Sequence, residues 1–149
     1  MTAVAAHVRT STLISVIISM AISAAFFLLV FGQRPLIAVF AAGGLALDFI
    51  PQTLAAGFMA ALMPSLQTRA KLLTGRMPGT PPAIAAIVKR ALALAVAALA
   101  LAAMITALLW IGKVEAMPWA SALALKIGYG GLLGLIITPA ALRAILPRG

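Results

Sequence analysis

The stretch TLISVIISMAISAAFFLLVF, at residues 12–31, contains no charged side chain. Because a helix rises about 1.5 Å per residue, one of this length crosses the roughly 30 Å hydrocarbon layer of a membrane. A cleaved signal peptide is the alternative, since Ala21 and Ser23 resemble a cleavage site. The apolar residues continue to Phe31, however, where a mature domain should begin. The stretch therefore predicts a first transmembrane helix.

Three further apolar runs follow, at residues 36–63, 91–110 and 119–142. Each is long enough to span a bilayer as a helix. Pro51, near the middle of the second run, lacks a backbone N–H and should kink or tilt that helix, and Pro64 should help to end it. We therefore expect four transmembrane helices.

Short turns with glycine and proline separate the first two runs, at residues 32–35, and the last two, at residues 112–118. Short connections favour antiparallel neighbours. The sequence thus predicts an all-α, integral membrane four-helix bundle, built from two transmembrane hairpins and forming one domain over residues 1–149. The composition agrees, because 64% of the residues are hydrophobic and 9% are charged, against about a quarter charged in soluble proteins.

The segment at residues 65–90 is polar and basic, and its centre, MPGTPP, cannot be continuous helix. We interpret it as the linker between the hairpins. Cations beside a bilayer are each attracted to anionic lipid by about 1 kcal/mol, so we expect this linker to contact anionic headgroups or a cytoplasmic partner, or simply to fix the topology. The five cations are Arg69, Lys71, Arg76, Lys89 and Arg90.

The distribution of lysine and arginine predicts the orientation. The side with the linker also carries Arg9, Arg143 and Arg148, whereas the other side carries only Arg34 and Lys113. This bias places both termini in the cytoplasm of a cell with a bacterial-type inner membrane. It also accounts for the net charge of +9 without nucleic-acid binding, because the cations lie at the ends of apolar segments rather than on one soluble surface.

The two hairpins resemble each other, and LALD at residues 45–48 falls at the same place as LALK at residues 123–126. A duplication would give parallel repeats related by an axis along the membrane normal. The alternative is that leucine- and alanine-rich helices resemble one another by composition alone.

The last residues of these two motifs, Asp48 and Lys126, are ionisable groups at predicted membrane depth, which costs about 2.5–3.5 kcal/mol each at a helix centre. With a helix starting at residue 36, Asp48 lies about 18 Å from the outer end, and Lys126 lies about 10 Å down the fourth helix. That offset is within reach of a lysine side chain, so the two groups could form a buried pair that fixes the helix packing. Lys126 could instead extend its amine toward the headgroups, leaving Asp48 unpaired.

The competing hypothesis is a polar site at the membrane midplane for a proton, a cation or a small solute. Asp48 would form it with Gln52, and Pro51 would leave a carbonyl free nearby, as in the broken helices of transporters. Tyr129, one turn from Lys126, could donate a hydrogen bond to either charged group.

Small residues flank both charged groups at helical spacing. Gly44 precedes Asp48 by four residues, and Gly130 and Gly134 follow Lys126 on broadly one face. Glycines four residues apart are typical of closely packed membrane helices, so we expect these three glycines to lie at helix contacts.

Catalysis is not expected from these residues. The chain has no cysteine, one acid in a predicted span and one histidine, His7, expected to be solvated; no metal or cofactor is predicted. The leading hypothesis is a non-enzymatic accessory or assembly subunit of a membrane complex. The alternative is a small homo-oligomeric transporter or channel that uses Asp48.

Overall fold

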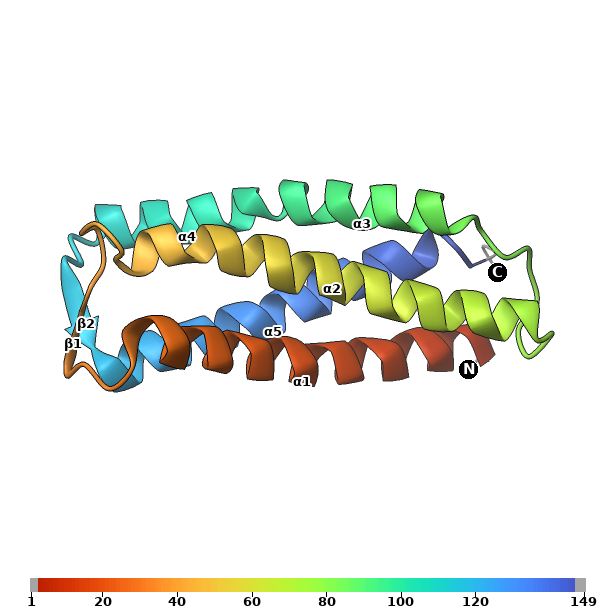
Figure 1. Ribbon diagram of the computed structural model, residues 1–149, viewed down its shortest axis with the longest axis horizontal. Coiled ribbons are helices and arrows are strands. Elements are labelled where there is room, and N and C mark those ends of the chain that lie inside the picture. The colour runs from red at the N-terminus through yellow and green to blue at the C-terminus, as the bar shows by residue number, and fades with distance from the viewer. Residues whose placement is uncertain (1–2, 147–149) are drawn as a thin grey trace.

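A computed structural model of the chain describes residues 3–146 (Figure 1). Arg148, counted above for the orientation, lies outside this range. The elements in chain order are α1 (Ala3–Phe31), β1 (Leu36–Ala38), α2 (Leu45–Leu73), α3 (Ile84–Ala97), α4 (Leu99–Ile111), β2 (Ala116–Pro118) and α5 (Trp119–Arg143). Helices α3 and α4 follow each other directly and together form one long apolar segment, Ile84–Ile111, called the α3–α4 rod below.

Within residues 3–146, four helices are long and apolar enough to cross a membrane. They are Ala3–Phe31, Leu45–Leu73, Ile84–Ile111 and Trp119–Arg143. The predicted all-helical architecture with four such helices is therefore confirmed, which makes this a multi-pass membrane protein by length and composition.

The start of the second helix was predicted wrongly. The helix begins at Leu45 rather than at residue 36, because residues 36–38 form a strand and the chain then turns back at Gly43, whose φ is +71°. Gly44, which we expected at a helix contact, lies in this turn instead. A Cβ atom there would lie 2.7 Å from the carbonyl oxygen of Val39 and 2.8 Å from that of Ala41, so the turn itself requires glycine.

The end of the second helix also differs from the prediction. Pro64 lies inside α2, which continues to Leu73, so the irregular linker is confined to residues 74–83. Proline deprives the carbonyl four residues earlier of its helical hydrogen bond. That carbonyl belongs to Ala60, and it accepts a hydrogen bond of 2.9 Å from the hydroxyl of Thr138 in α5. A neighbouring helix thus satisfies the group that the proline frees, as membrane helices require.

Helix α1 packs most extensively against α5, and α2 packs against α3 and α5. In Figure 1, α1 and the α3–α4 rod lie along opposite edges of the bundle. Helices α1 and α2, which we predicted to form a hairpin, therefore contact each other less than α1 contacts α5 or α2 contacts α3. Phe27, Phe49, Tyr129 and Leu133 are buried at the centre of these contacts.

The two predicted turns meet in a short antiparallel sheet, which the sequence did not reveal. Leu36 pairs with Pro118, and Ile37 pairs with Met117. The indole Nε1 of Trp119 donates a hydrogen bond of 2.6 Å to the carbonyl oxygen of Gly32 beside the sheet. These contacts hold the two hairpins together at one end of the bundle.

At the opposite end, three of the five linker cations bind their own chain. Arg69 donates to the carbonyl oxygen of Pro82 at 2.9 Å, and Arg90 donates to that of Ala144 at 3.1 Å. Lys71 Nζ lies 3.1 Å from Nδ1 of His7, whose Nε2 lies 2.9 Å from the hydroxyl of Thr68. His7 is therefore partly buried and bonded, not a solvated flanking residue.

Candidate functional site

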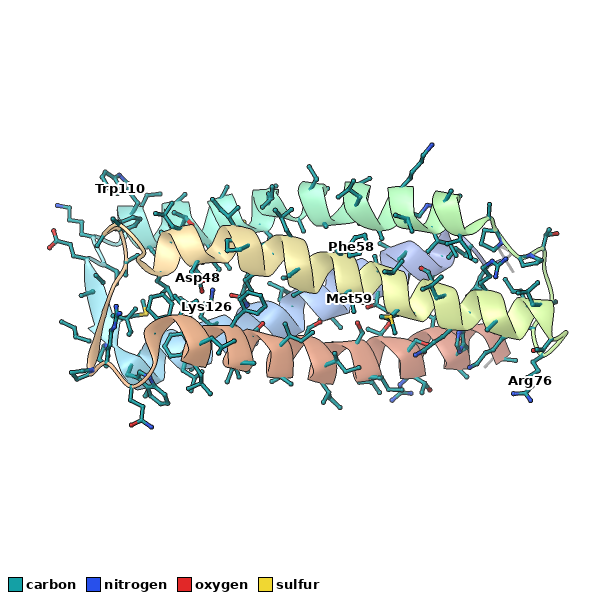
Figure 2. The ribbon with its side chains drawn as sticks, in the orientation of Figure 1. Asp48, Phe58, Met59, Arg76, Trp110 and Lys126 are labelled. Carbon is teal, nitrogen blue, oxygen red and sulfur yellow. The ribbon has the colours of Figure 1, made fainter. Side chains whose placement is uncertain are left out.

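Asp48 and Lys126 form an ion pair inside the bundle, between α2 and α5 (Figure 2). Nζ of Lys126 lies 2.6 Å from Oδ2 of Asp48, and the two residues are 0% and 8% exposed. The pairing that the sequence suggested as one alternative is thus formed within a single chain. Lys126 does not extend away to leave the acid unpaired.

The depth of the pair corrects our expectation of a midplane acid. Asp48 lies in the first turn of α2, three residues after Leu45, which places it roughly 5 Å along the helix axis rather than 18 Å. Lys126 lies seven residues into α5, about 10 Å along that helix as expected. Both groups are therefore near the end of the bundle that carries the β1–β2 sheet.

The surroundings of the pair are aromatic and closed. Nζ of Lys126 lies 4.5 Å from the ring centroid of Phe49, a distance at which the ring's negative face attracts a cation. The ring of Phe49 in turn packs edge-on against Tyr129, with centroids 4.8 Å apart. Among residues 3–146, neither Nζ nor Oδ2 has another hydrogen-bond partner, so each is the other's one partner of opposite charge.

Gln52 lies one turn after Asp48 and joins three helices. Its Nε2 donates to the hydroxyl of Ser23 in α1 at 2.6 Å and to the carbonyl oxygen of Lys126 in α5 at 3.4 Å. Its Oε1 is buried and has no partner in the described part of the chain. The predicted grouping of Gln52 with the charged pair is thus observed, with Gln52 binding the backbone of Lys126 rather than its amine.

Tyr129 has a different partner from the predicted one. Its hydroxyl forms a short hydrogen bond with the hydroxyl of Thr53 rather than with Asp48 or Lys126. Thr53 itself donates to the carbonyl oxygen of Phe49. Pro51 lies inside α2, between the charged pair and these residues, and does not end the helix.

A row of buried serines on α1, spaced by four residues, was missed in the sequence. Ser23 donates to the carbonyl oxygen of Ser19 at 2.7 Å, and the hydroxyl oxygens of Ser15 and Thr138 lie 2.7 Å apart. A four-residue spacing of small hydroxyl residues is a recognisable signal of a packed membrane helix face, and it could have identified α1 as the partner of α5. The members of the row are Ser11, Ser15, Ser19 and Ser23.

The serine row faces Gly130 and Gly134 of α5. A Cβ atom on Gly130 would lie 2.6 Å from the carbonyl oxygen of Ser19, and one on Gly134 would lie 2.9 Å from Cα of Val16. Both glycines therefore lie at a helix contact, as predicted, and the contact is with α1.

No family model, curated protein or solved structure matches this chain. Within residues 3–146, no three histidine, cysteine or acidic residues are grouped so that they could hold a metal ion. The chemistry that the described residues offer is therefore a buried ion pair, hydroxyl and amide hydrogen bonds, and cations at one end.

Proposed function

We propose that the chain is a non-enzymatic accessory or assembly subunit of a larger complex in a bacterial inner membrane, with both termini in the cytoplasm. The observation that carries this proposal is the ion pair between Asp48 and Lys126. A membrane acid that acts on a substrate needs a free oxygen or an exchangeable partner, whereas here the acid and base neutralise each other within the chain. Such a pair serves to fix which helices pack together.

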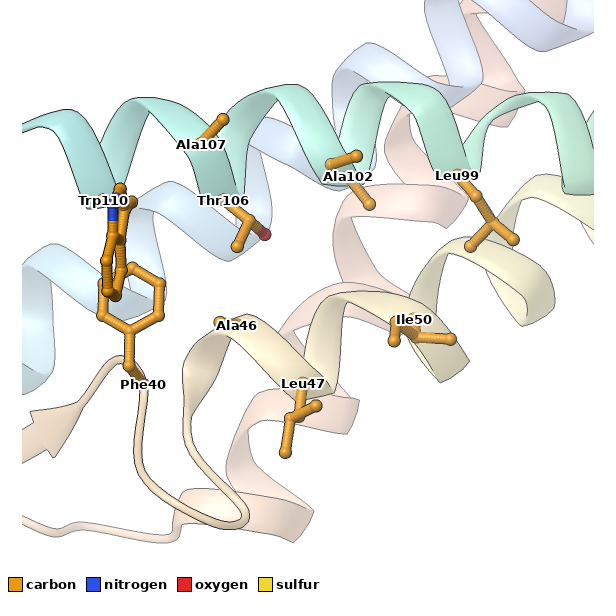
Figure 3. A pocket seen from close by; sticks show the side chains of 10 residues that line it. Phe40, Ala46, Leu47, Ile50, Leu99, Ala102, Thr106, Ala107 and Trp110 are labelled. Atoms are coloured by element: carbon orange, nitrogen blue, oxygen red, sulfur yellow. The ribbon is translucent and has the colours of Figure 1, made fainter.

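An apolar groove between α2 and α4 supplies a surface for the partner (Figure 3). It has a volume of about 800 Å³, and the rings of Phe40 and Trp110, 5.3 Å apart, close one end. Ala103 and Ala107 are exposed along α4. Small side chains allow another helix backbone to approach closely, which is how membrane helices associate.

The occupant that fits this groove is an apolar transmembrane helix of another protein. The hydroxyl of Thr106 lines the groove and has no hydrogen-bond partner among residues 3–146. A lipid chain cannot satisfy a hydroxyl group, whereas the backbone or a polar side chain of a packed helix can. The groove therefore favours a protein helix over lipid.

We expect leucine at both Ala103 and Ala107 to release a stoichiometric foreign subunit, because the added side chains fill the groove. The measurement is native mass spectrometry of the protein gently extracted from its own membrane. The control is Ala21→Leu, which adds the same side chain at an exposed position of α1 outside the groove. Retention of the subunit by the groove variant, or an assembly that contains only copies of this chain, would contradict the proposal.

A second candidate is a small transporter or channel for a proton, a cation or a small solute. The observation in its favour is the carbonyl oxygen Oε1 of Gln52, which is buried without a partner. Gln52 also donates a hydrogen bond to Ser23, the last member of the serine row on α1. Buried polar groups that continue along a helix face are typical of ion and proton pathways.

The assembly proposal predicts that the purified protein in liposomes conducts no more protons than empty liposomes, as reported by an internal pH-sensitive dye. Wild-type flux that Gln52→Leu abolishes would instead establish the second candidate. The matched variant is Gln33→Leu, which makes the same change at an exposed position in the turn after α1 and should leave any such flux intact.

A further inference from the structure

A second groove is lined by residues of α1 and α5. It lies at the end of the bundle where α1 begins and α5 ends, and Figure 1 shows these two helix ends on the same side. Its volume is about 940 Å³. Arg9 of α1 and Arg143 of α5 both line it. The groove is at the opposite end of α5 from the ion pair and is separate from the apolar groove on α4.

The two arginines of this groove are not neutralised. Arg9 and Arg143 are exposed, and neither has an ion-pair or side-chain hydrogen-bond partner within residues 3–146, in contrast to Arg69 and Arg90. The chain contains only two acidic residues. Asp48 is paired with Lys126, and Glu115 adjoins the sheet at the other end, so no acidic side chain within residues 3–146 is placed to compensate these arginines.

The walls of the groove below the arginines are apolar. Leu13 follows Arg9 by one helical turn, and Leu135 precedes Arg143 by about two turns. Their side chains are 56% and 55% exposed. Because α1 and α5 run in opposite directions, both leucines lie inward of the arginines, toward the middle of the spans.

We propose that this groove binds one anionic phospholipid. The phosphate lies between Arg9 and Arg143, where guanidinium groups provide paired hydrogen bonds and charge, and an acyl chain lies against Leu13 and Leu135. Basic pockets between membrane helices recognise lipid headgroups in this way. An anionic lipid is favoured over a zwitterionic one, because two uncompensated arginines repel the added cation of the latter.

The test is a titration of the purified protein with phosphatidylglycerol or phosphatidylcholine, with bound lipids resolved by native mass spectrometry. We expect one tightly bound phosphatidylglycerol, and binding roughly 30-fold weaker when Arg9 and Arg143 are both replaced by glutamine. The control is Arg76→Gln with Lys89→Gln, which removes the same charge from the same end of the bundle without touching the groove. Equal weakening of phosphatidylglycerol binding in the two variants would mean that the lipid is attracted by the overall positive charge of this end, and it would overturn the proposal.

Two further measurements distinguish a lipid ligand from a soluble phosphate compound. Leu135→Trp fills the groove while both arginines remain, and should weaken lipid binding, whereas Leu132→Trp, at an exposed position of α5 outside the groove, should not. Glycerol 3-phosphate should fail to displace the lipid, because it has no acyl chain to bury. Displacement by glycerol 3-phosphate, or no effect of Leu135→Trp, would contradict a lipid site.

Discussion

Replacement of Asp48 by asparagine should lower the free energy of unfolding by about 3–5 kcal/mol, because it leaves the amine of Lys126 charged and unpaired. Lys126 is fully buried, and Asp48 is its one ion-pair partner within residues 3–146. The measurement is unfolding of the purified protein by dodecyl sulfate in mixed micelles, followed by circular dichroism.

The double variant makes this prediction specific to the pair. Asp48→Leu combined with Lys126→Met removes both charges, and should recover most of the stability lost by Asp48→Asn, since an apolar pair has no unmet charge. Glu115→Gln neutralises the chain's other acid, which is exposed, and should change the unfolding free energy by less than about 0.5 kcal/mol. A double variant as unstable as the single one would mean that the two residues do not act as a unit.

The pairing of Asp48 with Lys126 could be predicted because each is costly alone in an apolar span and each had one possible partner of opposite charge. The depth of Asp48 in the bundle could not be predicted. It depends on where α2 begins, and residues 36–44 are as apolar as the helix that follows them. The pairing of Leu36–Ala38 with a strand almost 80 residues later determines where α2 begins. The hydropathy of the local sequence carries no information about that pairing.

The end of α2 was mispredicted for a related reason. Proline usually ends a helix because its missing N–H leaves a carbonyl unsatisfied. Here Thr138, on a different helix, satisfies the carbonyl of Ala60, so α2 continues through Pro64. The serine row on α1 is a different case, because its four-residue spacing is a signal of a packed helix face that the sequence itself contains.

The helix contacts support the hypothesis of an internal repeat. A two-fold axis along the membrane normal would exchange α1 with the α3–α4 rod and α2 with α5, so packing of α1 on α5 should be mirrored by packing of α2 on α3 and α4. Both sets of contacts are present. Residues near such an axis should meet their own equivalents, as Asp48 meets Lys126 across the LALD and LALK motifs.

Replacement of Gly130 by alanine should destabilise the bundle by about 1–3 kcal/mol, the usual range for an overpacked contact. The new methyl group would clash with the hydroxyl oxygen of Ser23, and would lie 2.8 Å from its Cβ atom and 2.6 Å from the carbonyl oxygen of Ser19, neither of which can rotate away. Helix α1 would therefore have to move away from α5, along the most extensive contact of the bundle. Unfolding in dodecyl sulfate provides the measurement.

Gly128 offers the matched control, because it lies on the same helix and a Cβ atom there would meet nothing within 4 Å. Alanine is favoured over glycine in a helix by up to about 1 kcal/mol, so Gly128→Ala should be neutral or stabilising while Gly130→Ala is destabilising. The opposite signs exclude an effect of helix propensity, which is the same at both positions. Equal effects of the two substitutions would show that α1 and α5 do not pack through Gly130. The hydrogen bond between Thr138 and Ser15 depends on the same close approach of the two helices, so this result would contradict that bond as well.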